Sequence, residues 1–508
     1  MKAKIYILSL LAVFFSSCDD YFSGMDIENE YEPNIGLVMQ DASPFPSLLS
    51  GICNTYWSQM LGYGNSAHWL FASTSDQLAP GAGNWDFKVY LYYAGVDKPE
   101  INNSNESASF PNEDWNSFYS MLNTLKDMQK GINEGAVYME DGEDATYKLL
   151  ANINFLMGTV YTEMALLFDQ CFVIGADTDV ATITGEDLVS AATVQQTALS
   201  YLDECIKICN EKGDFDNLAN AVTMFPNGTI ATGNKLKQMA NFMAARCLAY
   251  FPRTNTETVD WNKVLTYAKD GIQEDIITTL PYSGYPSWTV TGQSHKNGGW
   301  ARVGMRILEM MCPDEPNAVW PLPLDFGGST TLAEFKSPDA RLKTDFEYVP
   351  DNKSAAGVTF SGYTNYSPYT LNRFNEYVPN NGSGNLFLYT KSESDLLYAE
   401  ALVNTSSAAD AANIINETRV GRGELAPVSA ATPKEDLLEA LYYERFVECG
   451  FVNPLTPFYD RRRTPIDEFQ LATRSFRELP VPYYELKTYG LESYTFGGAK
   501  DEYPQYKF

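Results

Sequence analysis

Histidine is scarce in this chain, because only His68 and His295 occur among its 508 residues. Histidine is the side chain best suited to proton transfer near neutral pH, and it is a common zinc ligand. Two of them leave little room for histidine acid–base chemistry. The sequence also has no His-Glu-x-x-His motif, no nucleophile elbow and no phosphate-binding loop. The usual motif-based signs of a hydrolase or a nucleotide-binding enzyme are therefore missing.

Positive charge is also in short supply. The chain has 36 lysines and arginines against 65 aspartates and glutamates, which gives a formal net charge of −29. Such a surface repels nucleic acid and anionic lipid headgroups. We therefore expect neither as a partner.

The cysteines are too few and too awkwardly placed for a disulfide framework or a metal site. Cys205 and Cys209 lie four residues apart in a helical stretch, but a metal site would need further soft ligands nearby. No cofactor is predicted, and no Asp-x-Asp-x-Asp-Gly calcium loop occurs, although the many loop acids leave calcium binding open. If Cys18 is modified, an odd number of thiols remains, and buried free thiols are predicted. They are Cys53, Cys171, Cys205, Cys209, Cys247, Cys312 and Cys449.

Long apolar runs are missing after Cys18, and the short one before it has a special form. Lys2 and Lys4 precede an apolar core of about a dozen residues, which is too short to span a bilayer. Small serines stand directly before Cys18, and Asp19 and Asp20 follow it. This pattern predicts a lipoprotein signal, cleaved so that Cys18 becomes a lipidated N-terminus; the alternative is an ordinary secretory signal.

Helical periodicity dominates much of the remaining chain. Apolar residues recur at steps of three and four between Leu150 and Leu167, the spacing of a buried helix face. Ala151, Asn154 and Gly158 lie on a neighbouring face and would let another helix approach closely. Further helices are predicted at 115–125, 194–208, 236–250, 261–272, 393–403, 408–418 and 434–449.

These patterns predict a mostly α fold, a tetratricopeptide-like helical stack with a loop-rich cap and a few short strands. The exact 34-residue repeat is not visible. Between about Gly271 and Leu388 turn-forming and aromatic residues dominate, and a short strand is expected at 318–322. The predicted organisation is a signal peptide at 1–17, an N-terminal helical region at 18–270 and a C-terminal region of cap and helices at 271–508, packed as one body.

Several short motifs follow one another in a fixed order, and together with the lipoprotein start they resemble the SusD/RagB family of nutrient-binding lipoproteins. Gln77 stands where that family usually has glutamate, and Cys449–Pro454 departs from its Glu-Gly-x-Arg stretch. The matching segments are Thr74–Gln77, Trp115–Tyr119, Ser337–Arg341, Leu396–Leu402, Ala411–Arg419, Glu444–Glu448 and Leu479–Leu486.

The resemblance implies a role without catalysis. Proteins of this family sit on the outer face of the outer membrane, over a SusC-like TonB-dependent transporter. They capture oligosaccharides, less often peptides, and pass them to the pore. The resemblance therefore implies a lipid-anchored, extracellular, glycan-binding protein with such a transporter as its partner.

Glycan capture needs flat aromatic faces with amides and acids beside them. Two loops supply this mixture. Asn84 and Trp85 lie in one, and Tyr285, Trp288 and Trp300 lie in the other. These five residues are the predicted ligand-binding residues, and packing of the loops is the alternative role for each.

Charged residues near the C-terminus could suggest catalysis. Glu444, Arg445 and Glu448 fall on one helix, and Arg419 and 339–341 add further charge. Because both signs are interleaved, we predict a structural ion-pair network.

Three rival functions stay open. A peptide-capturing member of the same family would look alike in sequence. A secreted glycosidase needs only two carboxylates at a fixed separation, and 65 acidic residues leave that open. A scaffold that uses its helices only for protein contacts would bind no small ligand.

Overall fold

The structure is a computed structural model of the whole chain. The residues that it describes are 39–60, 67–80, 100–104, 110–218, 230–280, 290–294, 301–320, 333–350, 367–373, 384–405, 407–453, 455–472 and 474–497.

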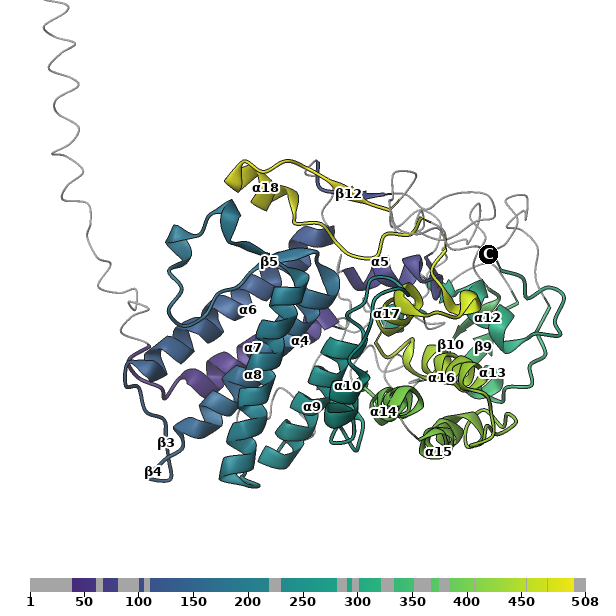
Figure 1. Cartoon of the computed structure of the whole chain (residues 1–508), viewed down its shortest axis with the longest axis horizontal. Coiled ribbons are helices and arrows are strands. Elements are labelled where there is room, and N and C mark those ends of the chain that lie inside the picture. Colours follow the sequence, from purple (N-terminus) through teal and green to yellow (C-terminus); the bar gives the residue numbers. More distant parts are fainter. Residues whose placement is uncertain are drawn as a thin grey trace, which may run out of the picture.

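Helices α6 to α10 stack side by side in chain order, and α4 packs against α6 and α7 (Figure 1). α7 contacts α6 and α8, and α9 packs on both α8 and α10. Neighbours in sequence are thus neighbours in space, as in a tetratricopeptide-like stack. The helices are α4 (Phe45–Met60), α5 (Ala67–Thr74), α6 (Phe110–Asn133), α7 (Thr146–Leu167), α8 (Ala191–Lys212), α9 (Gly233–Ala249) and α10 (Trp261–Ala268).

The second half continues the stack and adds shorter elements. α10 contacts α14, which in turn contacts α15 and α16. The three helices expected there are confirmed, with α14 beginning two residues before the predicted 393. The elements are α11 (Val290–Ser294), α12 (Met305–Met311), α13 (Arg341–Thr344), α14 (Lys391–Thr405), α15 (Ala408–Arg419), α16 (Lys434–Cys449), α17 (Thr456–Arg463), η6 (Asp467–Phe469) and α18 (Tyr483–Tyr489).

Strands are short and pair only in twos among the described residues. Because helices make up most of the elements, the predicted mostly α fold class is confirmed. The expected strand at 318–322 is wrong for 318–320, where the Ala318 N–H instead closes a turn on the Glu315 carbonyl at 3.0 Å. Residues 321 and 322 lie outside the described chain. The antiparallel pairs are β1 (Leu78–Pro80) with β8 (Ala301–Val303), β2 (Ile101–Asn102) with β12 (Thr495–Phe496), β3 (Met139–Glu140) with β4 (Glu143–Asp144), β5 (Gln170–Phe172) with β6 (Leu188–Ser190), β7 (Ile276–Leu280) with β11 (Gly384–Tyr389), and β9 (Phe346–Tyr348) with β10 (Tyr369–Leu371).

α7 is the central helix of the first half. Its apolar spacing indicates one buried face, but the structure buries it on nearly every side. The reason is that α4, α6, α8 and α9 all contact it. The predicted close approach of a second helix is confirmed at Gly158, where a Cβ atom would stand 2.6 Å from Leu202 Cγ on α8.

Side-chain caps fix where several helices begin. Ser190 Oγ accepts from the Thr193 N–H at the start of α8, and Asp260 Oδ1 accepts from the Lys263 N–H at the start of α10. These bonds satisfy amides that have no partner within the helix. α8 ends at Gly213, whose positive φ of 73° suits glycine. No helix in the described part of the chain is both long and apolar enough to cross a membrane.

Candidate functional site

The predicted ligand-binding residues Asn84, Trp85, Tyr285, Trp288 and Trp300, and the predicted lipidation residue Cys18, all lie outside the described residues. The structure does describe the chain on both sides of their loops. β1 ends at Pro80 and β8 begins at Ala301, and these two residues are register partners in the β1–β8 pair.

This pairing joins one end of each of the two predicted binding loops. The loop with Trp85 leaves from Pro80, and Trp300 is the residue directly before Ala301. α11, which follows the segment with Tyr285 and Trp288, also contacts β8. Segments that are about 200 residues apart in sequence therefore start from one small sheet.

The charged residues near the C-terminus form the predicted ion-pair network, in two separate clusters. In the first, Arg341 donates to Glu444 at 2.7 Å and to Glu448 at 2.8 Å, and it also pairs with Asp339. All four side chains are fully buried. A guanidinium that is satisfied on all sides by carboxylates has a structural role.

In the first cluster, burial and the neighbouring arginines shift the pKa values of the carboxyl groups in opposite directions. Burial raises the pKa of Glu444 despite the Arg341 guanidinium beside it. Burial alone would also raise the pKa of Glu448, but Arg373, Arg341 and Arg422 outweigh it and lower the pKa. Of Glu444 and Glu448, Glu448 is therefore the one held more firmly as an anion.

Arg445 belongs to the second cluster, although sequence places it between Glu444 and Glu448. It donates to Glu400 at 2.6 Å from a different side of α16, and Arg463 donates to the same carboxylate at 2.8 Å. Both arginines also reach Asp460. Glu400 stands in an apolar run of α14, and a charge in such a run is the sequence signal that could have revealed this buried cluster.

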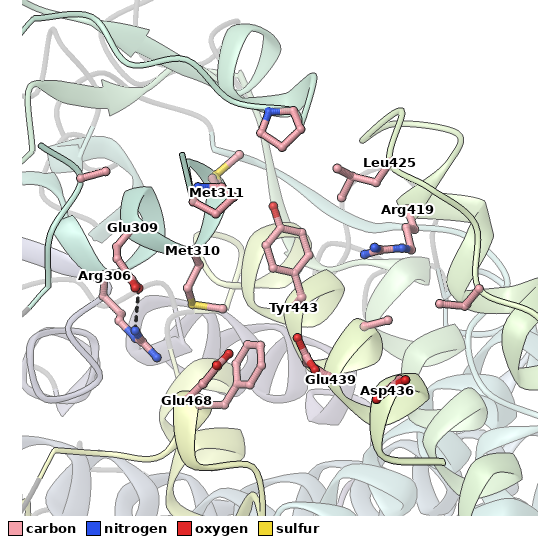
Figure 2. A pocket seen from close by; sticks show the side chains of 16 residues that line it. Arg306, Glu309, Met310, Met311, Arg419, Leu425, Asp436, Glu439, Tyr443 and Glu468 are labelled. Atoms are coloured by element: carbon pink, nitrogen blue, oxygen red, sulfur yellow. Dashed lines mark hydrogen bonds and ion pairs between the residues drawn. The ribbon is translucent and has the colours of Figure 1, made fainter. Parts of the chain in front are cut away.

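A cavity lies next to the first cluster, because its lining residues Tyr443 and Arg419 reach Asp339 and Glu444. Figure 2 shows the side chains that line it. Its volume of about 680 Å³ lies within the range of sites for small ligands. Sequence reasoning did not find it, because it joins α12, the end of α15, α16 and η6, which are far apart in the chain. The lining residues are Arg306, Glu309, Met310, Met311, Pro313, Ala318, Pro338, Arg419, Leu425, Val428, Asp436, Glu439, Ala440, Tyr443, Glu468 and Phe469.

Charge is distributed unevenly around this cavity. Arg306 donates to Glu309 at 2.7 Å on one side, as Figure 2 shows. Asp436, Glu439 and Glu468 lie along another side. Burial raises the pKa of Glu439, and the neighbouring Glu468 and Asp436 raise it further.

Within the described residues, neither the clusters nor the cavity contains a metal-binding group or a histidine placed for proton transfer. In the described part of the chain, no three His, Cys, Asp or Glu side chains are grouped so that they could hold a metal ion. His68 is fully buried, and burial, followed by the nearby Arg246, lowers its pKa to about 3. A histidine held neutral inside the core is not placed to exchange protons with a ligand at the surface.

Solved structures resemble this fold, whereas no protein-family model and no curated protein sequence matches the chain. A SusD superfamily protein from Bacteroides vulgatus matches with a TM-score of 0.55 and 12% identity, over 88% of this chain and 97% of its own. The chain has the SusD-like fold. SusD-like carbohydrate-binding proteins match similarly. The one from Bacteroides fragilis has a TM-score of 0.55 and 15% identity, over 83% and 87% of the two chains. The one from Bacteroides vulgatus has a TM-score of 0.53 and 14% identity, over 82% and 83%.

At these identities the SusD-like fold is what the chains share. The similarity spans most of each chain. The resemblance seen in short sequence motifs thus extends to the architecture.

Proposed function

We propose that this protein is a cell-surface lipoprotein that captures oligosaccharides and delivers them to a SusC-like TonB-dependent transporter in the outer membrane. Cys18 carries the lipid that anchors it at the extracellular face. Binding, without cleavage of the ligand, is its activity.

The β1–β8 pair is the observation that supports this proposal most strongly. It ties one end of each of the two aromatic loops together through Pro80 and Ala301. Trp85 is five residues from Pro80, so it stays within about 18 Å of this sheet along the chain. Trp300 is bonded directly to Ala301. Tryptophan rings that start from one sheet can stack on successive units of one sugar chain.

The fold supports the same function. Two of the similar structures are described as carbohydrate-binding proteins of the SusD-like type. A site built from several aromatic and hydrogen-bonding contacts gives modest affinity. Modest affinity suits a protein that has to release its ligand to a transporter.

A binding screen tests the proposal. The unlipidated protein, Asp19–Phe508, would be titrated with plant, host and microbial glycans and with a peptide pool, and each mixture would be checked for cleavage. We expect one uncleaved glycan class to bind, and Trp85→Ala and Trp288→Ala to abolish that binding. Cleavage of the glycan would identify a hydrolase instead, and binding of peptides alone would identify a peptide-capturing protein.

A matched pair of variants separates stacking from folding. Trp261 is a half-buried tryptophan at the start of α10 and belongs to neither loop. Trp261→Ala should leave glycan affinity unchanged. Equal loss of affinity in Trp261→Ala and Trp288→Ala would show that general destabilisation, and not a lost sugar contact, explains the effect.

A further inference from the structure

The cavity between α12, α16 and η6 has a fixed aromatic side chain at its centre. Tyr443 projects into it from α16 (Figure 2). Its hydroxyl donates to Asp339 Oδ2 at 2.7 Å, and the Arg341 guanidinium lies 5.7 Å from the ring centroid. Because Asp339 and Arg341 are themselves fully buried and paired, the ring is held in one position before any ligand arrives.

Apolar side chains complete the wall around this ring. Met310 and Met311 come from α12, and Phe469 comes from η6. Tyrosine and methionine beside a ring-sized space suit the C–H faces of a sugar unit. The wall therefore fits a ligand that is partly apolar and partly polar, as a sugar is.

The polar groups indicate which kind of sugar fits. Asp436, Glu439 and Glu468 line the cavity, and none of them forms an ion pair within the described residues. The positive charges nearby are already engaged, because Arg306 pairs with Glu309, and Arg419 lies 3.7 Å from Glu444. Arg306 also acts on Glu468 and Arg419 on Glu439 at longer range, but the carboxylates of the lining outnumber its guanidinium groups. The cavity thus offers an excess of negative charge to whatever enters it.

A buried donor gives a second, independent indication of a ligand. Arg306 lines the cavity and is only 6% exposed, yet its Nε–H has no hydrogen-bond acceptor in the part of the chain that the structure describes. A buried donor without an acceptor is costly, and a ligand oxygen would satisfy it. Arg306 therefore indicates a ligand independently of the carboxylates, which can accept hydrogen bonds but offer no such donor.

We propose that this cavity is a second sugar subsite that binds a unit carrying a protonated amine, a 2-amino-2-deoxy sugar of a longer glycan. The ammonium lies among Asp436, Glu439 and Glu468, and the pyranose ring lies against Tyr443. The net charge of −29 also favours a cationic ligand, since it repels glycans rich in carboxylates or sulfates. This subsite rests on the proposed glycan capture and narrows its substrate class.

Two probes with the same sugar backbone, one with protonated amines and one with neutral acetamides, test the subsite. One is the β-1,4-linked tetramer of glucosamine, and the other is the same tetramer with every amine acetylated. Calorimetric titration at pH 6 should show tighter binding of the amine form. In Glu439→Gln/Glu468→Gln, affinity for the amine form should fall about five- to tenfold, as expected for two partly exposed charge contacts, with little change for the acetylated form.

A matched double variant removes the effect of net charge. Glu211 and Glu435 are exposed and lie outside the cavity lining, so Glu211→Gln/Glu435→Gln loses the same two charges elsewhere. It should bind both tetramers like the wild type. Equal loss in the two doubles would show that the amine form binds through general attraction to an acidic surface, which would overturn the subsite.

Further outcomes keep this proposal separate from glycan capture itself. Equal affinity of the wild type for the two tetramers, or no binding of the amine form, would overturn the subsite. Trp288→Ala is measured with the glycan class found in the screen, so glycan capture can stand when the subsite fails. Tyr443→Phe keeps the ring and should bind normally, whereas Tyr443→Ala should weaken binding of both tetramers.

Discussion

Arg341 and Glu444 join the start of α13 to α16 through two hydrogen bonds, from Nη1 at 2.7 Å and from Nη2 at 3.1 Å. Both side chains are fully buried. The bond holds the loop-rich part of the second half against the helical stack, directly beneath the cavity that Tyr443 lines. A structural pair therefore positions a candidate binding surface.

Replacing Arg341 by methionine should destabilise the protein by about 3–5 kcal/mol, because three carboxylates would lose their common partner inside the core. Urea unfolding at pH 7 measures this difference. Lys207→Met breaks the exposed pair with Glu204 on α8 and serves as the control. It should change the free energy of unfolding very little, because an exposed ion pair is screened by water. Similar losses in both variants would contradict a central role for Arg341.

Thiol reactivity should distinguish the folded from the unfolded protein. Seven cysteines in the described chain are free and buried, as the sequence predicted. Burial raises the pKa of the Cys247 and Cys312 thiols to about 12, so the reactive thiolate is rare at neutral pH. Native Asp19–Phe508 should react with a thiol reagent only slowly, and all seven groups should react in denaturant. Rapid reaction of several groups in the native state would contradict this burial.

Much of the fold could be predicted from the sequence because a helix produces a periodic apolar pattern within one short segment. The apolar spacing around Leu150–Leu167 and the position of Gly158 predicted both a helix and its close neighbour, and the structure has both. The strand predicted at 318–320 was wrong because the sequence pattern there is too short to identify one kind of structure. Apolar residues there pack as a turn after α12, and a short apolar run does not distinguish a turn from a strand.

The sites were less accessible to sequence reasoning. Glu444, Arg445 and Glu448 were correctly predicted as structural ions, yet their division into two clusters depends on which face of α16 each one occupies. Partners such as Glu400 come from elements that are brought together only by the stack. The cavity around Tyr443 has the same origin, since no single segment contains more than a small part of its wall.

Acid should weaken the protein partly through Glu400. Burial alone would raise its pKa, but Arg445 and Arg463 outweigh burial and lower the pKa to about 2. A carboxyl group with a depressed folded pKa stabilises the fold above its unfolded pKa, and this stabilisation is lost as the pH falls from about 4.3 toward 2. The other groups that face it are Asp460, whose pKa burial raises, and the Tyr442 hydroxyl, which donates at 2.9 Å.

Glu400→Gln is the variant that reveals this contribution. The free energy of unfolding should differ most between wild type and variant near pH 7, and the difference should narrow as the pH approaches 2. Urea titrations at several pH values measure the narrowing. Glu204→Gln, on the exposed face of α8, should show a small and constant difference. A constant gap for Glu400→Gln would show that its ionisation is not coupled to folding in this range.

Gly158 should tolerate no larger side chain. A Cβ atom there would stand 2.6 Å from Leu202 Cγ and 3.0 Å from the Ala198 carbonyl oxygen, which belongs to the backbone of α8. Gly158→Val must therefore push α8 away from α7, at a cost of about 1–3 kcal/mol or more. Thermal or urea unfolding checks this loss. Gly51, in α4, has no atom within 4 Å of its Cβ position, so Gly51→Ala should be neutral or stabilising by up to about 1 kcal/mol. Gly158→Ala makes the same change as Gly51→Ala at a helical glycine with different surroundings. Opposite signs in these two alanine variants would assign the effect to helix packing, whereas equal signs would assign it to the backbone.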